Sequence, residues 1–353
     1  MSGARRTLLA AVLVAGLVSW LFTGHPEASW PLQQIDDYVL NVVVLAGINV
    51  LLAVSLNMVN GHTGQFSLGH AGFMAVGAYV SAAVTMGLPR VLGWVSGPET
   101  WLGQGIFLVG LVVGGLAAAA AGVLVGVPSL RLRGDYLAIV TLGFGEIIKV
   151  VIQNTDVLGG PRGINGIPLY TSLGWTVGAA AVGIYVVSAV VNSTYGRGFL
   201  GVRDDEIAAE AMGVNTTRYK VVAFVLGAFF AGVSGGLYAH FITYITPEGF
   251  SFLKSVDVIV MVILGGMGST LGVAAAAVIL TVLNELLRQV EQYRMVVFSV
   301  LLIVMMISRP QGLLAGFGDL FRRRKEEGRG VGNGCWSYRR WGVGLAGCKR
   351  WRT

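Results

Sequence analysis

The chain consists of long apolar runs separated by short polar stretches, and most of the runs are long enough to cross a lipid bilayer. A transmembrane helix needs roughly 20 residues to span about 30 Å of hydrocarbon. The pattern predicts an all-α, polytopic membrane protein of about ten transmembrane helices, with nine as the alternative count. The predicted spans are at about residues 8–22, 38–59, 65–86, 102–127, 136–153, 172–191, 221–241, 252–264, 271–287 and 295–307.

The distribution of basic residues gives the expected orientation. Cytoplasmic loops are enriched in Lys and Arg, and Arg5 and Arg6 precede the first run, whereas the loop at 23–34 contains neither residue type. We expect residues 1–34 to form an uncleaved first span followed by an outside loop, with the N-terminus inside. The alternative is a signal peptide. An Arg-rich C-terminal end on the same side requires an even number of crossings, which favours ten.

Composition supports a membrane protein and shows where the positive charge lies. The 353 residues are 54% hydrophobic and 12% charged, against about 25% charged in soluble domains. Eleven Lys or Arg and three acidic residues lie after residue 308, so the chain's net charge of +7 belongs to this end. We therefore expect residues 321–353 to form a basic cytoplasmic tail near the membrane surface, and we predict no nucleic-acid binding. Its cysteines, Cys335 and Cys348, have no zinc or redox spacing.

One strongly charged segment, residues 196–213, separates the sixth and seventh predicted spans. Alanine favours helix, and acidic side chains are stabilising near a helix N-terminus. We predict one short helix in water, which Gly213 and the following Asn215 would end. It is either a solvated loop that only joins two spans or a docking helix on which a soluble partner pushes. The candidate residues are Arg203, Asp204, Asp205, Glu206, Ala208, Ala209, Glu210, Ala211, Met212 and Gly213.

A polar stretch, residues 57–72, lies between the second and third predicted spans. Backbone that is not regular helix at membrane depth is tolerated only where it is buried in protein or lines water. One interpretation is a tight cytoplasmic turn. The other is a broken segment that borders a translocation path, where Asn57, Gln65, Ser67 and His70 offer neutral hydrogen bonds. A hydrogen bond to a neighbouring helix also explains a lone histidine such as His70.

The fifth predicted span contains two ionisable residues, Glu146 and Lys149, at the i, i+3 spacing that allows them to neutralise each other. Ionisable groups at membrane depth are costly and suggest function. Because a cation is adjacent, we favour a structural pair that faces the bundle, and we keep Glu146 as a candidate for the translocation path.

Several motifs of enzymes and metal sites are absent from the sequence. It contains no Gly-x-x-x-x-Gly-Lys-Ser/Thr phosphate loop, no His-Glu-x-x-His and no Gly-x-Ser-x-Gly. A Gly-x-Gly-x-x-Gly pattern at 342–347 follows no predicted strand and is attributed to chance. We predict no catalytic residue, no metal site and no cofactor bound by this chain.

Four groups of short, glycine-rich motifs occur along the chain. They are residues 55–73 with 77–79, residues 130–147, residues 159–168 with 196–213, and residues 264–269 with 309–313. Together they resemble the permease subunits of branched-chain amino acid ABC importers, most closely the second, LivM-type, of the two permeases. The resemblance covers about residues 39–314. The tail after about Lys325 departs from it, because family members usually end soon after the last motif.

The resemblance implies a permease subunit of an ATP-driven importer of leucine, isoleucine and valine, located in the bacterial inner membrane. The permease domain would span residues 35–320, with a coupling helix at about 196–220 that docks on an ATPase. The implied partners are a second permease subunit, two cytoplasmic ATPase subunits that bind ATP and magnesium, and a periplasmic or lipid-anchored substrate-binding protein.

Two alternatives stay open at this point. Permeases of urea or short-chain amide ABC importers look similar. A member of a different class, an ion-driven secondary transporter acting alone, would use Glu146 and Asp257 as proton or sodium carriers.

Overall fold

The computed structural model describes residues 37–92, 100–130 and 135–287, together with the single residues 296, 300 and 303. These residues belong to one compact unit, residues 1–315. The predicted first span and the basic tail with Cys335 and Cys348 lie outside the described residues, as does the predicted last span at 295–307 apart from these three single residues. The number of spans and the domain limits at residues 34 and 320 therefore stay predictions.

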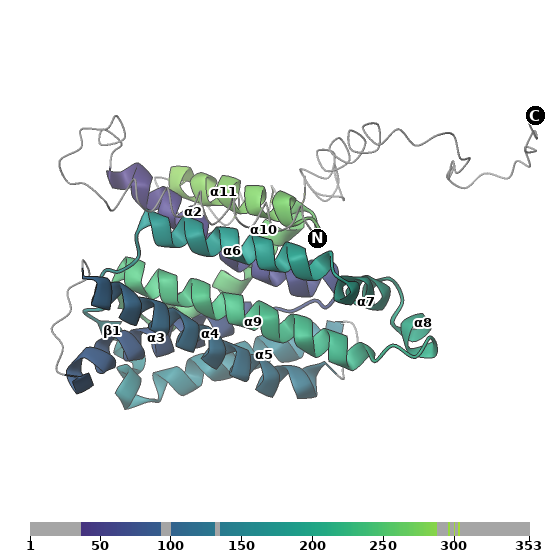
Figure 1. Ribbon diagram of the computed structural model, residues 1–353, viewed down its shortest axis with the longest axis horizontal. Coiled ribbons are helices and arrows are strands. Elements are labelled where there is room, and N and C mark those ends of the chain that lie inside the picture. Colours follow the sequence, from purple (N-terminus) through teal and green to yellow (C-terminus); the bar gives the residue numbers. More distant parts are fainter. Residues whose placement is uncertain are drawn as a thin grey trace, which may run out of the picture. The chain divides into compact units, whose positions relative to one another are not determined.

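The described part is almost entirely helical, and its helices follow the apolar runs (Figure 1). The elements of the first half are α2 (Asp37–Asn57), the π-helical turn η2 (Met58–His62), α3 (His70–Leu92), α4 (Trp101–Ser129), α5 (Asp135–Gln153), and the 3₁₀ turns η3 (Asp156–Leu158) and η4 (Gly160–Arg162). Those of the second half are β1 (Ile164–Asn165), α6 (Leu173–Val191), α7 (Thr194–Asp204), α8 (Glu206–Ala211), α9 (Thr216–Ile242), β2 (Tyr244–Ile245), η5 (Pro247–Phe250), α10 (Phe252–Gly265) and α11 (Thr270–Leu286).

Length and composition allow six of the described helices to cross a membrane. They are α2 with η2, α3, α4, α5, α6 and α9. The helices α10 and α11 are shorter, with 14 and 17 residues. The predicted class, an all-helical polytopic membrane protein, is confirmed.

Helix α9 packs against α3 and α4 at the centre of the bundle. The backbones of α3 and α9 approach so closely that a Cβ atom on Gly77 would lie 2.2 Å from the Cα of Gly232. Small residues allow this approach, and in lipid such close packing is a main source of helix association. Some of the chain's 52 glycines thus serve close packing between helices.

Helix α2 is buried by neighbours on several sides, because it contacts α6, α9, α10 and α11. Leu52, Ala53 and Val54 are each 0% exposed. A helix that is apolar all round is stable only where protein or lipid surrounds it, and here other helices supply much of that cover.

The two ends of the bundle differ in structure. At one end β1 pairs antiparallel with β2, with Ile164 opposite Ile245, and this joins the loop after α5 to the end of α9. At the other end of α9 lie α7 and α8, as Figure 1 shows. The charged segment 196–213 and the polar stretch that follows α2 lie at this second end.

Several predicted helix limits differ from the structure, among them the end of α3, which lies at Leu92 instead of residue 86. The third predicted span begins at residue 65, but residues 63–69 are not helical and α3 begins at His70. The seventh begins at Thr216 instead of residue 221. The fourth continues through Pro128 to Ser129, so the proline lies in the last turn and does not end the helix before itself.

Candidate functional site

The charged segment forms two helices, α7 and α8, and not the single short helix predicted to end at Gly213. Helix α7 ends at Asp204, and Asp205 adopts an extended conformation with φ −157° and ψ 108° before α8 begins at Glu206. Arg203 and Asp204 therefore belong to the end of α7 and are not part of the short helix. The prediction erred because charge and helix propensity do not reveal a one-residue break.

Both ends of α8 are fixed by local hydrogen bonds. At its start, the Asp205 side chain accepts hydrogen bonds from the backbone N–H groups of Ile207 and Ala208 at 2.9 and 3.0 Å, the usual task of an N-cap aspartate. The predicted preference of acidic residues for this helix start is therefore correct.

At the end of α8, Gly213 has a φ of 82°, a conformation that glycine adopts without strain. Its N–H donates to the carbonyl of Glu210, and the N–H of Val214 donates to that of Ala209, which is the Schellman pattern. Gly213 thus ends the helix as predicted. Asn215 has another role, because its side chain accepts a hydrogen bond from the N–H of Arg218 and caps α9.

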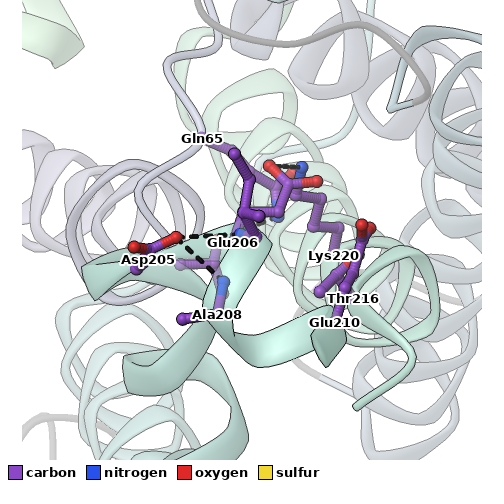
Figure 2. Close-up of polar contacts among 9 residues, drawn as sticks. Gln65, Asp205, Glu206, Ala208, Glu210, Thr216 and Lys220 are labelled. Carbon is purple, nitrogen blue, oxygen red and sulfur yellow. Dashed lines mark hydrogen bonds and ion pairs between the residues drawn. The ribbon is translucent and has the colours of Figure 1, made fainter. Parts of the chain in front are cut away.

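Two side chains of α8 hold it against the start of α9, as Figure 2 shows. The Glu206 carboxylate pairs with the Lys220 ammonium at 2.6 Å, and the Lys220 side chain is only 6% exposed. The Thr216 hydroxyl donates to the Glu210 carboxylate at 2.8 Å. Sequence reasoning missed both contacts, although an acidic and a basic residue fourteen positions apart across a glycine stop were a usable signal for the ion pair.

The opposite side of α8 is exposed and partly apolar. Ile207 is 68% exposed and Met212 84% exposed, and Ala208 and Ala211 between them are exposed as well. Ala209 is buried. A six-residue helix that is fixed on one side and presents large apolar side chains on the other is suited to contact another protein.

The polar stretch between α2 and α3 is a broken, largely buried segment in which Gly64 and Phe66 are exposed. All five residues of η2 are buried, and so are Gln65 and Ser67 in the non-helical part. Side chains satisfy part of this backbone: Asn60 Oδ1 accepts the N–H of Ser67 at 3.2 Å, and Asn57 Oδ1 accepts that of Gly268 at 2.9 Å. Irregular backbone of this kind needs such protection from lipid.

The predicted path residues have different surroundings. His70 Nε2 lies 2.7 Å from the Ser55 hydroxyl of α2, so the alternative of a hydrogen bond to a neighbouring helix is correct for this contact. Among the described residues, Asn57 Nδ2, Gln65 Oε1 and the Ser67 hydroxyl are buried without a hydrogen-bond partner. These three groups are able to bind water or a polar solute.

Glu146 lies on α5 and lines a small cavity with Leu68 and Gly72 of the polar stretch. Its ion pair with Lys149 is confirmed, with the two charged groups 3.6 Å apart. A second carboxylate oxygen accepts the N–H of Phe252 at the start of α10, at 3.3 Å. The Glu146 side chain is 40% exposed, so the pair faces the bundle only in part.

Within the described ranges, no group of three or more histidine, cysteine, aspartate or glutamate side chains is placed to hold a metal ion. The polar groups of this end instead belong to the short helix α8 and to a largely buried irregular segment. Together with the helical bundle they define a polytopic membrane protein of the transporter class.

Residues 38–307 match the family described as "Branched-chain amino acid transport system / permease component". The chain belongs to this family. It is therefore a permease component and not an enzyme.

Known relatives carry names of the same kind. The chain is 36% identical over 321 residues to the high-affinity branched-chain amino acid transport system permease protein LivM of Escherichia coli K12, covering 81% of this chain and 72% of that one. It is 26% identical to the permease protein LivH of the same organism, over 80% of this chain and 95% of LivH. It is 22% identical to a probable LivM of Methanocaldococcus jannaschii, over 79% and 93%.

A solved chain of PsaBC from Streptococcus pneumoniae in complex with Fab has 17% identity and a TM-score of 0.30, covering 71% of this chain and 92% of that one. This likeness is too low to inform the fold.

Proposed function

We propose that this chain forms, with a second permease subunit, the membrane path of an ATP-driven importer of leucine, isoleucine and valine. Family membership and similarity to both LivM and LivH support a pair of related permeases. Two cytoplasmic ATPase subunits, which bind ATP and magnesium, drive the cycle, and a periplasmic or lipid-anchored binding protein supplies the substrate.

The observation that carries the proposal is the geometry of α8. Its ends are capped, its acidic side chains are paired with α9, and Ile207 and Met212 point outward. Such a helix presents a fixed surface on which an ATPase subunit can push. The α8 end of the bundle then lies in the cytoplasm, and the β1 end lies on the outer side of the inner membrane.

Residues of this chain line a path that has an outward-open and an inward-open state. ATP binding and hydrolysis in the partner shift the permease between outward-open and inward-open states through different contacts in each state. Asn57, Gln65 and Ser67 border the path, because their free polar atoms lie in the broken segment. His70 holds the start of α3 against α2, and Glu146 contributes a charged group where α5 meets α10.

The docking role is tested by replacing apolar side chains on the exposed side of α8 with charged ones. Ile207→Glu and Met212→Glu leave the Glu206–Lys220 pair intact but place charge on the contact surface. We expect each variant to lose most of the co-purifying ATPase, whereas Val157→Glu, which changes an equally exposed side chain on η3, retains it. Unchanged ATPase recovery with both α8 variants would contradict docking at α8.

The substrate is tested by uptake in vesicles that contain the whole assembly with its binding protein. We expect ATP-dependent uptake of labelled leucine, reduced by an excess of isoleucine or valine and not by urea or acetamide. Competition by urea alone would favour a urea importer. Exchange of leucine by the chain alone under an ion gradient would favour a secondary transporter.

A further inference from the structure

Three segments that are far apart in the sequence meet at the end of α7. One is the last turn of α7 with Arg203, another is the π-helical turn η2, and the third is the glycine turn between α10 and α11. Arg203 Nη1 donates a hydrogen bond to the carbonyl of Gly61 in η2 at 3.2 Å. In the glycine turn, the N–H of Gly268 donates to Asn57 Oδ1, at the end of α2, at 2.9 Å, and Gly268 lies close to both Gly61 and Arg203.

The three segments pack tightly at this junction because glycines, which have no side chain, lie at the contacts. A Cβ atom on Gly268 would lie 3.1 Å from Arg203 Nη1, and one on Gly61 would lie 2.4 Å from the backbone nitrogen of Gly268. A Cβ atom on Gly64 would lie 2.9 Å from Arg203 Cγ. Gly64 and Gly268 also have φ values of 70° and 90°, which disfavour any other residue. The Arg203 side chain, 37% of which is exposed, therefore fits closely against the backbone of η2 and of the turn.

The junction is joined to α8 by a very short link. Only Asp204 and Asp205 separate Arg203 from the first residue of α8, and the N–H of Asp205 donates to the carbonyl of Gly201 in α7. The Arg203 side chain also lies 3.4 Å from the carboxylate of Asp204, which is 71% exposed. A solvent-exposed pair of this kind contributes little, so the contact of Arg203 with Gly61 is the directional one.

We propose that Arg203 is the positioning residue that transmits the movement of α8 to the broken segment at 58–69 and to the glycine turn at 265–269. This inference rests on the proposed function, because it presupposes that an ATPase moves α8. Arg203 does not dock on the ATPase. Its guanidinium holds the carbonyl of Gly61, and so it fixes the place of η2, which leads directly to Gln65 and Ser67.

An arginine suits this task for a geometric reason. A guanidinium offers five N–H donors in a rigid, planar fork on a long side chain. It can donate to the Gly61 carbonyl while its stem packs on Gly64. A lysine keeps the charge and one donor to the carbonyl, but it loses the planar fork.

The test measures the uptake of labelled leucine per ATP hydrolysed, in vesicles that contain the complete assembly. For Arg203→Ala we expect ATPase subunits to co-purify at the wild-type amount, hydrolysis to continue, and uptake per ATP to fall about tenfold, since a hydrogen bond from a charged donor is lost. Arg203→Lys should give an intermediate ratio. Arg162→Ala, which removes an exposed arginine near β1, should leave the ratio unchanged.

A merely structural role of Arg203 would lower the amount of assembled complex but not its uptake per ATP. An unchanged ratio in Arg203→Ala overturns the proposal, and so does loss of ATPase co-purification from a permease pair that still assembles, which would make Arg203 part of the docking surface. If alanine prevents assembly, Arg203→Gln, which stays polar but is too short to reach the carbonyl, decides in the same way. Absence of ATP-driven leucine uptake in the wild-type assembly would instead refute the proposed function itself.

Discussion

Asp205 connects two helices that the sequence suggests are one. Its backbone is extended, and its carboxylate caps α8 by accepting two backbone N–H groups. In a helix of six residues the first turn is a large part of the whole, so the cap matters more than in a long helix. The orientation of Ile207 and Met212 thus depends on this cap, together with the contacts of Glu206 and Glu210 to α9.

Removing the cap should weaken ATPase binding without changing the docking surface. Asp205→Ala costs about 1 kcal/mol of helix stability, and this corresponds to about fivefold weaker binding of the ATPase to the purified permease pair. Asp205→Asn keeps an acceptor oxygen and should bind nearly as wild type, which separates the cap from the charge. Equal affinities for the alanine variant and the wild type would show that α8 does not need its cap.

Among the helices, α3 and α9 depend on direct contact of their backbones. The contact at Gly77 and Gly232 leaves no space for a methyl group, because the nearest atoms on the other helix are backbone atoms that cannot rotate away. By contrast, nothing lies within 4 Å of the position of a Cβ on Gly87, in the same helix. Identical substitutions on one helix should therefore have opposite consequences.

We expect Gly77→Ala to lower the melting temperature of the detergent-solubilised protein, since overpacking a close contact typically costs about 1–3 kcal/mol. Gly87→Ala should leave it unchanged or raise it, because alanine favours helix over glycine by about 1 kcal/mol. Thermal unfolding followed by circular dichroism compares the two variants. Equal losses in both would mean that α3 does not approach α9 as described.

For the whole molecule, the two ends of the bundle should face opposite compartments. Met212 on α8 is 84% exposed and Val157 on η3 is 92% exposed, and Figure 1 places α8 and β1 at opposite ends. We expect Met212→Cys, in a chain with Cys335→Ser and Cys348→Ser, to react with a membrane-impermeant maleimide only in inside-out vesicles. Val157→Cys in the same background should react in intact cells. Labelling of Met212→Cys from outside would contradict both the orientation and ATPase docking.

The sequence alone determined the class of the protein and most of its elements. Apolar runs of roughly 20 residues can only be buried in lipid or in other helices, which is why α2, α3, α4, α5, α6 and α9 lie near their predicted places. The Glu146–Lys149 pair and the Gly213 helix stop were also predictable, because both depend on residues within one or two turns of each other.

Only the tertiary structure decided how the irregular segments are used. It placed the helix break at Asp205 and the ion pair of Glu206 with Lys220 across the turn after α8. It also brought together residues that are far apart in the chain, in the contacts of Asn57 with Gly268 and of Arg203 with Gly61. No local propensity specifies such pairs, because they depend on which segments the folded bundle brings together. At Gly61 and Gly268 the backbones approach so closely that only glycine fits. The sequence therefore located a charged helix and a polar stretch, and the packing of the bundle connected them.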